Sequence, residues 1–391
     1  MNVPRNICVV HVRCRINSKE NSTIFSTMNE DLPNNPNDVT LAIAKAYVQR
    51  NLPSNTTNTV NADMFEPRER RHGRPVSVPK IQILPEEDVS HAVNGNTYIY
   101  KRWVEGGDVP HPVGVHNPNL VDCELLDAVD WSVYSNNDTV LFYNEKREFL
   151  FAKLSPRACA DVKGSQGSRS EHMRDVFRRA CRLKGNICRG KERKGVGGIY
   201  KCFGWRKCYD GLPIAEYVYQ PSAEEGEVEW IDLNLKEHIR RMELVARRVL
   251  SRLVLFHWLM GLVRYIKLPS FSQGKRAPNQ TGIFTQVAMS SDGSWSNLHT
   301  DKDYGITMLS TLSAVLGDKS EVIYHFHFPS YLTSIPLRSG DIILYDSNVP
   351  HCSSNARNKD DYLYSAYISS KTVEYAMLEM VQEVVVEKSK V

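Results

Sequence analysis

The C-terminal part of the chain is a series of short apolar segments divided by turn residues. Segments of this length, bounded by Gly, Pro, Asn, Asp and Ser, are typical of β-strands. Their number and lengths suit a small double-stranded β-helix, a jelly-roll barrel that holds its ligand at one open mouth. The segments span residues 282–289, 298–301, 306–312, 322–328, 342–345 and 362–369. We therefore predict an α+β fold with this barrel in its C-terminal part.

Three residues within this series have the side chains and the spacing of metal ligands. His299 and Asp301 are separated by one residue, so their side chains lie on the same face of an extended strand. His351 follows the apolar strand 342–345, after a turn formed by Val349 and Pro350. Two imidazoles and one carboxylate, with other positions open, are the ligands of non-haem Fe(II) oxygenases. The sequence predicts that these three residues bind a metal and form the catalytic centre. The alternative is a chance match in a chain with 12 histidines.

The residues between the ligands resemble a known superfamily. Residues 335–345, Ile-Pro-Leu-Arg-Ser-Gly-Asp-Ile-Ile-Leu-Tyr, lead into His351 and resemble the Pro-Leu-x-x-Gly-Asp strand of Fe(II)/2-oxoglutarate dioxygenases. Residues 297–305 are similar to the strand that carries the first two ligands there. Within the superfamily, the chain looks most like the nucleic-acid base hydroxylases related to the TET and J-binding proteins. The resemblance covers the C-terminal part alone.

The resemblance implies an oxidoreductase that uses Fe(II), 2-oxoglutarate and dioxygen to hydroxylate a nucleic-acid base, such as 5-methylcytosine or thymine. Two other functions stay open at this point. One is a hydroxylase of the same superfamily that acts on a protein or a small molecule. The other is a barrel without catalysis that binds nucleic acid.

The expected 2-oxoglutarate site departs from the pattern of the superfamily. Its members place an Arg or Lys in an Arg-x-Ser strand after the distal histidine, to bind the far carboxylate of 2-oxoglutarate. Residues 362–367 read Tyr-Leu-Tyr-Ser-Ala-Tyr and contain no base. A buried carboxylate needs a cation or several hydrogen bonds. We expect Arg357 to supply the cation, because its planar fork can pair with a carboxylate through two bonds. The alternatives are Lys319, Lys359, Lys371 and tyrosine hydroxyls.

Neighbouring residues are expected to complete the site. Tyr304 and Tyr345 are predicted to line the pocket and contact the co-substrate. Asn297, Ser347 and Asn348 are predicted to orient the metal ligands. His325 and His327 share a face of one strand, but no carboxylate follows them at a suitable spacing, so they are expected in the pocket wall or on the surface.

The chain is expected to have three regions. Residues 1–79 are rich in Asn, Ser, Thr and Pro and are predicted to be largely extended or disordered. Residues 80–215 are predicted to form a basic α+β accessory region, with strands at 81–84, 98–104, 140–143 and 149–154. Residues 216–391 are predicted to hold the barrel and its supporting helices, with helical spacing at 230–266 and 372–387.

The accessory region contains a concentration of positive charge. Residues 156–208 include fifteen Lys or Arg and four Asp or Glu, with aromatic residues interleaved. Such a segment suits a polyanion with bases that can stack, and nucleic acid is the predicted partner. The alternative is a solvated basic face. Ser168 and Glu171 fit the capping box of a helix whose arginines, among them Arg178, Arg179 and Arg182, lie off its apolar stripe.

Cysteines and apolar runs bear on compartment and metal content. Cys181, Cys188, Cys202 and Cys208 lie in the basic segment, but their gaps are wider than those of structural zinc sites, and zinc stays an open alternative. The longest apolar run, 253–263, is too short to cross a membrane. The first twenty residues lack a secretory signal, so we expect a nuclear or cytoplasmic protein with reduced thiols. The oligomeric state is not indicated.

Overall fold

A computed structural model gives the fold. It describes residues 80–85, 129–134, 138–146, 148–154, 166–183, 198–206, 214–216, 225–250, 254–274, 282–301, 303–314, 321–354 and 356–389. The region 1–79 and the strand expected at 98–104 lie outside the described residues.

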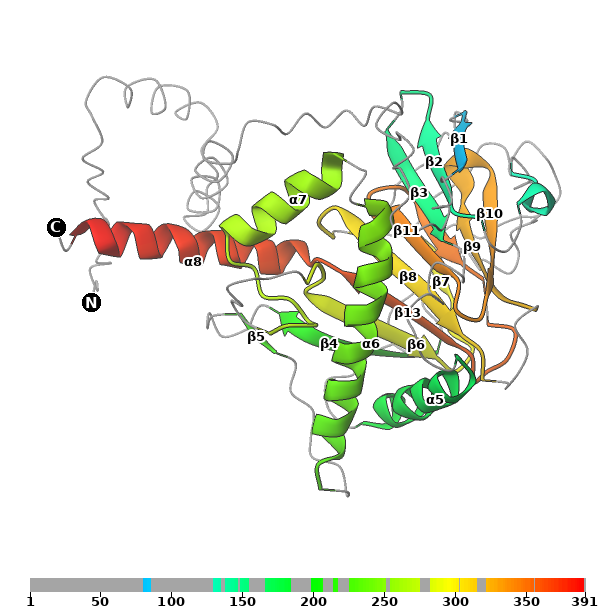
Figure 1. The fold of residues 1–391 in the computed structure, drawn as a ribbon, viewed down its shortest axis with the longest axis horizontal. Helices are drawn as coiled ribbons and strands as arrows, with labels where there is room; N and C mark the ends of the chain where they lie inside the picture. Colours follow the sequence, from blue (N-terminus) through cyan, green and yellow to red (C-terminus); the bar gives the residue numbers. More distant parts are fainter. Residues whose placement is uncertain are drawn as a thin grey trace, which may run out of the picture.

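Eight strands form a barrel of two facing sheets (Figure 1). They are β6 (Gln286–Ser291), β7 (Ser296–His299), β8 (Ile306–Leu312), β9 (Val322–Phe328), β10 (Thr333–Arg338), β11 (Ile342–Asp346), β12 (His351–Ser353) and β13 (Tyr362–Tyr367). The larger sheet contains the order β11-β8-β13-β6, and the smaller sheet has the order β10-β9-β12-β7. All neighbouring barrel strands pair antiparallel. This order is the topology of a double-stranded β-helix, and it confirms the predicted fold class.

Strands from the first half of the chain extend the larger sheet to nine strands. On the β11 edge lie β3 (Phe149–Leu154), β2 (Val140–Asn144) and β1 (Lys80–Leu84), and on the β6 edge lie β4 (Ile199–Arg206) and β5 (Ala215–Glu216). The boundary expected between residues 215 and 216 therefore falls inside β5. In the described part of the chain, residues 80–215 share a continuous sheet with the barrel.

Four helices cover the outer face of the larger sheet (Figure 1). They are α5 (Gln166–Arg182), α6 (Glu227–Leu250), α7 (Val254–Tyr265) and α8 (Ser370–Ser389). The apolar stripe of α5, with Met173, Phe177 and Ala180, packs in one buried cluster with outward residues of the sheet such as Tyr364. A second cluster, with Phe151, Phe326 and Tyr345, fills the space between the two sheets. No helix among the described residues is long and apolar enough to cross a membrane.

The sequence placed most elements well, and its errors have physical reasons. Residues 230–266 form two helices, with a break after Leu250. Helix α5 begins at Gln166, so Ser168 lies within its first turn and is not the cap that we expected. The sequence missed β10 and β12. Strand β10 contains Pro336, which is tolerated because β10 is an edge strand, and β12 has only three residues.

Candidate metal centre

The fold brings the three predicted ligands together at one end of the barrel. His299 ends β7, His351 begins β12, and these two residues are directly paired across the smaller sheet. Asp301 follows β7, and its backbone N–H donates to the Ser347 carbonyl at 3.0 Å. Its carboxylate lies 3.4 Å from His299 Nε2 and 3.3 Å from His351 Nε2. One ligand atom from each residue lies within 4.8 Å of the others.

These distances fit donors that share one metal ion. Two donors that each lie about 2.1 Å from a metal and subtend a right angle are separated by roughly 3 Å. The distances from Asp301 to the two imidazoles are only slightly wider. Two imidazoles and a carboxylate are also the donor set preferred by Fe(II) in open three-ligand sites. The residues present therefore fit an iron ion.

The tautomer of His351 strengthens this assignment. Its Nδ1 lies 2.8 Å from the Val349 carbonyl, which can only accept a hydrogen bond. A proton on Nδ1 therefore leaves the Nε2 lone pair facing the Asp301 carboxylate. Two acceptors in contact repel each other unless a cation, either a proton or a metal ion, lies between them. The His351 imidazole is almost completely buried, so water does not relieve this repulsion.

The electrostatics keep the ligands in the forms that bind metal. Burial alone would raise the pKa of Asp301, but hydrogen bonds and charges from His299 and His351 outweigh it and lower that pKa strongly. Burial, followed by the charge of His299, lowers the pKa of His351. An ionised carboxylate and a neutral imidazole are the protonation states required of metal ligands.

The residues around the triad fix its position. Ser347 is buried, its carbonyl holds Asp301, and its hydroxyl lies 3.4 Å from the Asp303 carbonyl, as expected of a residue that orients the ligands. The Tyr345 ring meets the His351 ring edge to face, with centroids 4.9 Å apart. Asn348 instead bonds Asp346 in an exposed turn, and the side chain of Asn297 lies outside the described residues.

A pocket of about 100 Å³ opens beside the triad inside the barrel. Tyr345 lines it, as predicted from the sequence. Tyr304 is not among its described lining residues; it packs with the cluster under the helices, and its backbone N–H donates to the Ile368 carbonyl. His325 and His327 are also absent from the described lining, because Phe326 between them points into the pocket.

The structure contradicts the role expected of Arg357. Its guanidinium pairs with Glu321, lies 4.0 Å from Asp361 and donates to the Ser313 hydroxyl, and it does not line the pocket. These partners lie near the strand ends opposite the triad. Lys359 is exposed and pairs with Asp292, and Lys371 is also absent from the described lining. Lys319 lies outside the described residues.

Sequence reasoning missed the hydroxyl groups that line this pocket. They belong to Tyr200, Ser290, Ser294, Ser296, Ser353 and Ser365. Each comes from a strand or strand end of the barrel or from β4 beside it. Alternation along each strand was the available signal, but which face points inward becomes clear only when the strand register is known.

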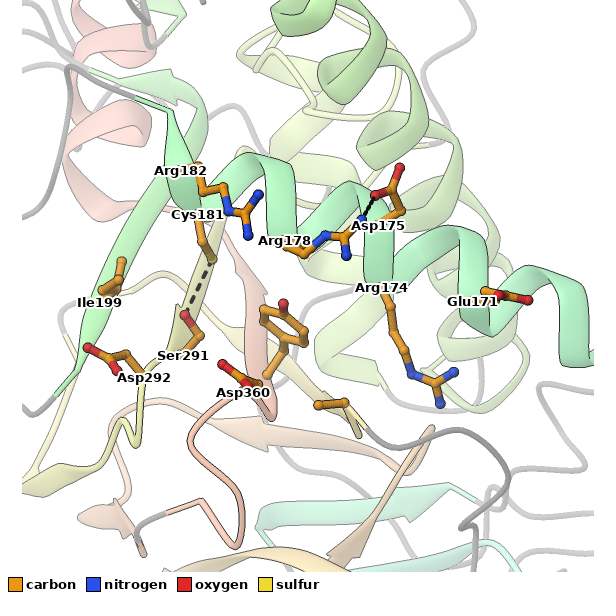
Figure 2. A pocket seen from close by; sticks show the side chains of 12 residues that line it. Glu171, Arg174, Asp175, Arg178, Cys181, Arg182, Ile199, Ser291, Asp292 and Asp360 are labelled. Carbon is orange, nitrogen blue, oxygen red and sulfur yellow. Dashed lines mark hydrogen bonds and ion pairs between the residues drawn. The ribbon is translucent and has the colours of Figure 1, made fainter.

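The arginines of α5 lie at the other end of the barrel. Arg174, Arg178 and Arg182 line a cavity of about 720 Å³, between α5 and the strand ends that lie away from the triad. Figure 2 shows them on α5, with Asp292 and Asp360 on the facing loops. Arg178 and Arg179 both pair with Asp175, and Arg179 also contacts Glu227 and stacks over Trp230. This helix is therefore partly neutralised, and a nucleic acid held here needs further contacts to reach the metal.

The cysteine alternative concerns four residues, of which Cys188 and Cys208 lie outside the described part. Cys181 accepts a hydrogen bond from Ser291 on the outer face of the larger sheet. Cys202 lies on the opposite face of β4 from Lys201, whose ammonium group reaches the Leu183 carbonyl at the end of α5. The Cys202 thiol lies 3.9 Å from the Tyr367 hydroxyl. The sheet therefore separates Cys181 from Cys202, and the two do not share a zinc ion.

Comparisons with known proteins agree with this geometry. No protein-family model and no curated protein matches the chain by sequence. Among solved structures, NgTET1 in complex with 5mC DNA matches with a TM-score of 0.35 and 13% identity, over 62% of this chain and 80% of that one. A viral collagen prolyl hydroxylase from Paramecium Bursaria Chlorella virus-1, in a 2OG complex, matches with a TM-score of 0.26 and 11% identity, over 56% and 94%.

A Burkholderia pseudomallei oxidoreductase of the 2OG-Fe(II) oxygenase family matches with a TM-score of 0.27 and 12% identity, over 52% of this chain and 91% of that one. At these scores the assignment of the fold rests on strand order and register. Strand order, triad and matched structures together define a class: a double-stranded β-helix with a two-histidine, one-carboxylate centre. The resemblance to Fe(II)/2-oxoglutarate oxygenases predicted from the sequence is confirmed at the level of the fold.

Proposed function

We propose that this protein is an Fe(II)-dependent dioxygenase that uses 2-oxoglutarate. The observation that carries the proposal is the contact of Asp301 with two imidazoles, of which His351 presents a lone pair to the carboxylate. That arrangement requires a cation. In this class of site, the iron with its 2-oxo acid and dioxygen supplies the oxidising chemistry.

The residues of the chain have separate tasks in this proposal. His299, Asp301 and His351 hold the iron on one side and leave the pocket side open for 2-oxoglutarate and dioxygen. Val349 and Ser347 orient the ligands through backbone carbonyls. Phe326 and Tyr345 pack around His351 and exclude water from its buried face.

Removal of single ligands tests the metal assignment. Asp301→Ala and His351→Ala should each abolish 2-oxoglutarate-dependent succinate release, because two remaining ligands hold iron weakly. Ser132→Ala serves as the control, since Ser132 lies on the surface, away from the barrel mouth. Circular dichroism should show that the variants keep the fold. Succinate release by either ligand variant at the parent's rate would contradict the assignment.

We further propose a nucleic-acid base as the substrate, as the sequence resemblance implies. The basic segment 156–208 supports this proposal, because its excess of positive charge suits phosphate groups. Exposed ion pairs such as Arg178 with Asp175 contribute little stability, so a phosphate can compete for the arginine. The rival is a protein or small-molecule substrate, for which the basic segment is only a solvated surface.

A further inference from the structure

The pocket beside the triad is rich in hydroxyl groups and contains no cationic side chain other than imidazole among its described lining residues. Its charged and titratable lining groups are the triad and two tyrosines. Its volume of about 100 Å³ corresponds to roughly three water molecules in the liquid, so it admits a small organic acid. What the hydroxyls recognise depends on how many of their hydrogens are already used.

Ser296 and Ser353 form a reciprocal pair across the smaller sheet. The N–H of Ser296 donates to Ser353 Oγ at 3.0 Å, and the N–H of Ser353 donates to Ser296 Oγ at 3.1 Å. Their two hydroxyls are 3.0 Å apart, so one donates to the other. Each hydroxyl has one hydrogen, so the second hydrogen of the pair is left for another acceptor.

Ser365 supplies a second donor from the larger sheet. It lines the pocket from β13, and its hydroxyl has no hydrogen-bond partner among the described residues. Ser290, on the adjacent strand β6, donates to the Leu363 carbonyl at 3.1 Å. Leu363 lies two residues before Ser365 on the same face of β13 and also lines the pocket. It occupies the position where the related oxygenases have the arginine of Arg-x-Ser.

These donors lie at a suitable distance from the metal ligands. Ser353 is two residues beyond His351 on β12, which corresponds to roughly 6.6 Å along a strand. A five-carbon dicarboxylate that binds iron by its 2-oxo acid end extends about that far into the barrel. No carboxylate other than Asp301 lines this part of the pocket among the described residues. Donors without a nearby acceptor suit an anionic group.

We propose that the distal carboxylate of 2-oxoglutarate is bound in this protein by hydroxyls, from Ser365 and from the Ser296–Ser353 pair, in place of a basic side chain. This inference rests on the proposed function. It replaces the expected role of Arg357 and makes Ser365 the residue that selects a dicarboxylic over a monocarboxylic 2-oxo acid.

The first test compares two ligands in calorimetric titrations of the Mn(II)-loaded protein, in which no turnover occurs. 2-Oxoglutarate has the distal carboxylate, and 2-oxopentanoate has the same chain length without it. Ser365→Ala should weaken binding of 2-oxoglutarate about tenfold or more, because a hydrogen bond to a charged group is lost. Binding of 2-oxopentanoate should not change. Equal effects on both acids, or no effect on 2-oxoglutarate, would overturn the proposal.

The second test introduces the missing cation. Leu363→Arg should tighten 2-oxoglutarate binding at least about tenfold relative to the neutral control Leu363→Met, because a charged donor then faces the carboxylate. It should not tighten binding of 2-oxopentanoate. If Leu363→Arg binds 2-oxoglutarate no more tightly than Leu363→Met, the carboxylate lies elsewhere. Mn(II) affinity is measured first, so a failed metal site, which would refute the proposed function, is distinguished from a wrong assignment of the carboxylate.

Discussion

At the scale of single residues, the sequence identified the metal ligands but not the groups around them. His299 and Asp301 are neighbours in sequence, and His351 follows a recognisable strand and turn, so local spacing was sufficient. Arg357 was predicted from its chemistry alone, and the structure pairs it with Glu321 instead. The pocket serines come from four strands and are brought together only by long-range pairing.

His238 provides a residue-scale prediction about pH. It hydrogen-bonds the Tyr364 hydroxyl at 3.0 Å beside Phe177, and burial lowers its pKa to about 4. The unfolded chain takes up this proton below about pH 6.5, whereas the folded protein does so only near pH 4. The contribution of His238 to stability is therefore present above pH 6.5 and is lost as the pH falls through that window.

His238→Gln should remove this dependence and keep a hydrogen-bonding group beside Tyr364. The measurement is the free energy of unfolding by urea at several pH values between 4 and 7. The parent should lose up to about 2–3 kcal/mol more than the variant across the window, with the lower figure favoured by partial exposure of the ring. Parallel curves for the two proteins would show that His238 titrates normally in the folded state.

At the scale of elements, a buried carboxylate ties α6 to the start of the barrel. Glu243 accepts the backbone N–H groups of Ile283 and Phe284 at 2.8 and 3.0 Å and the Ser272 hydroxyl at 2.5 Å. Burial raises its pKa, and these hydrogen bonds oppose the rise. The two N–H groups precede β6, so this contact sets the entry of the strand that carries Ser290.

We predict that Glu243→Ala lowers the free energy of unfolding by about 3 kcal/mol, because two buried N–H groups lose their acceptor. Glu243→Gln retains a carbonyl oxygen for both groups and should cost less than half as much. Urea unfolding followed by tryptophan fluorescence measures both. Equal losses in the two variants would indicate that packing volume, rather than hydrogen bonding, is the role of this side chain.

At the scale of the whole molecule, the barrel was predictable and its extensions were not. Six of its eight strands follow from apolar runs and turn residues, because that pattern is local. The addition of β1 to β4 at both edges of one sheet depends on pairing across more than 50 residues, as between β1 and β2. No local pattern carries that information, so residues 80–215 were assigned to an accessory region.

The position of α5 gives a whole-molecule prediction about nucleic acid. The double variant Arg178→Glu, Arg182→Glu should weaken binding to double-stranded DNA and lower the log–log salt slope by about two. Half-saturation by 2-oxoglutarate should stay the same, because α5 lies at the end of the barrel away from the triad. Arg240→Glu on α6 is the matched control: like Arg178 it is half-exposed and pairs with an acid three residues earlier. A parent that does not bind DNA, or an unchanged salt slope, would favour the rival substrates.

The most direct test of the central claim is an anaerobic titration of the protein with Fe(II), followed by 2-oxoglutarate, with the visible absorption spectrum recorded. A 2-oxo acid chelated to iron gives a charge-transfer band, so the spectrum reports the metal and the co-substrate together. We predict one iron bound per chain and a band that develops with 2-oxoglutarate and is lost in Asp301→Ala. Absence of iron binding, or a band that persists in Asp301→Ala, would contradict the proposed metal centre.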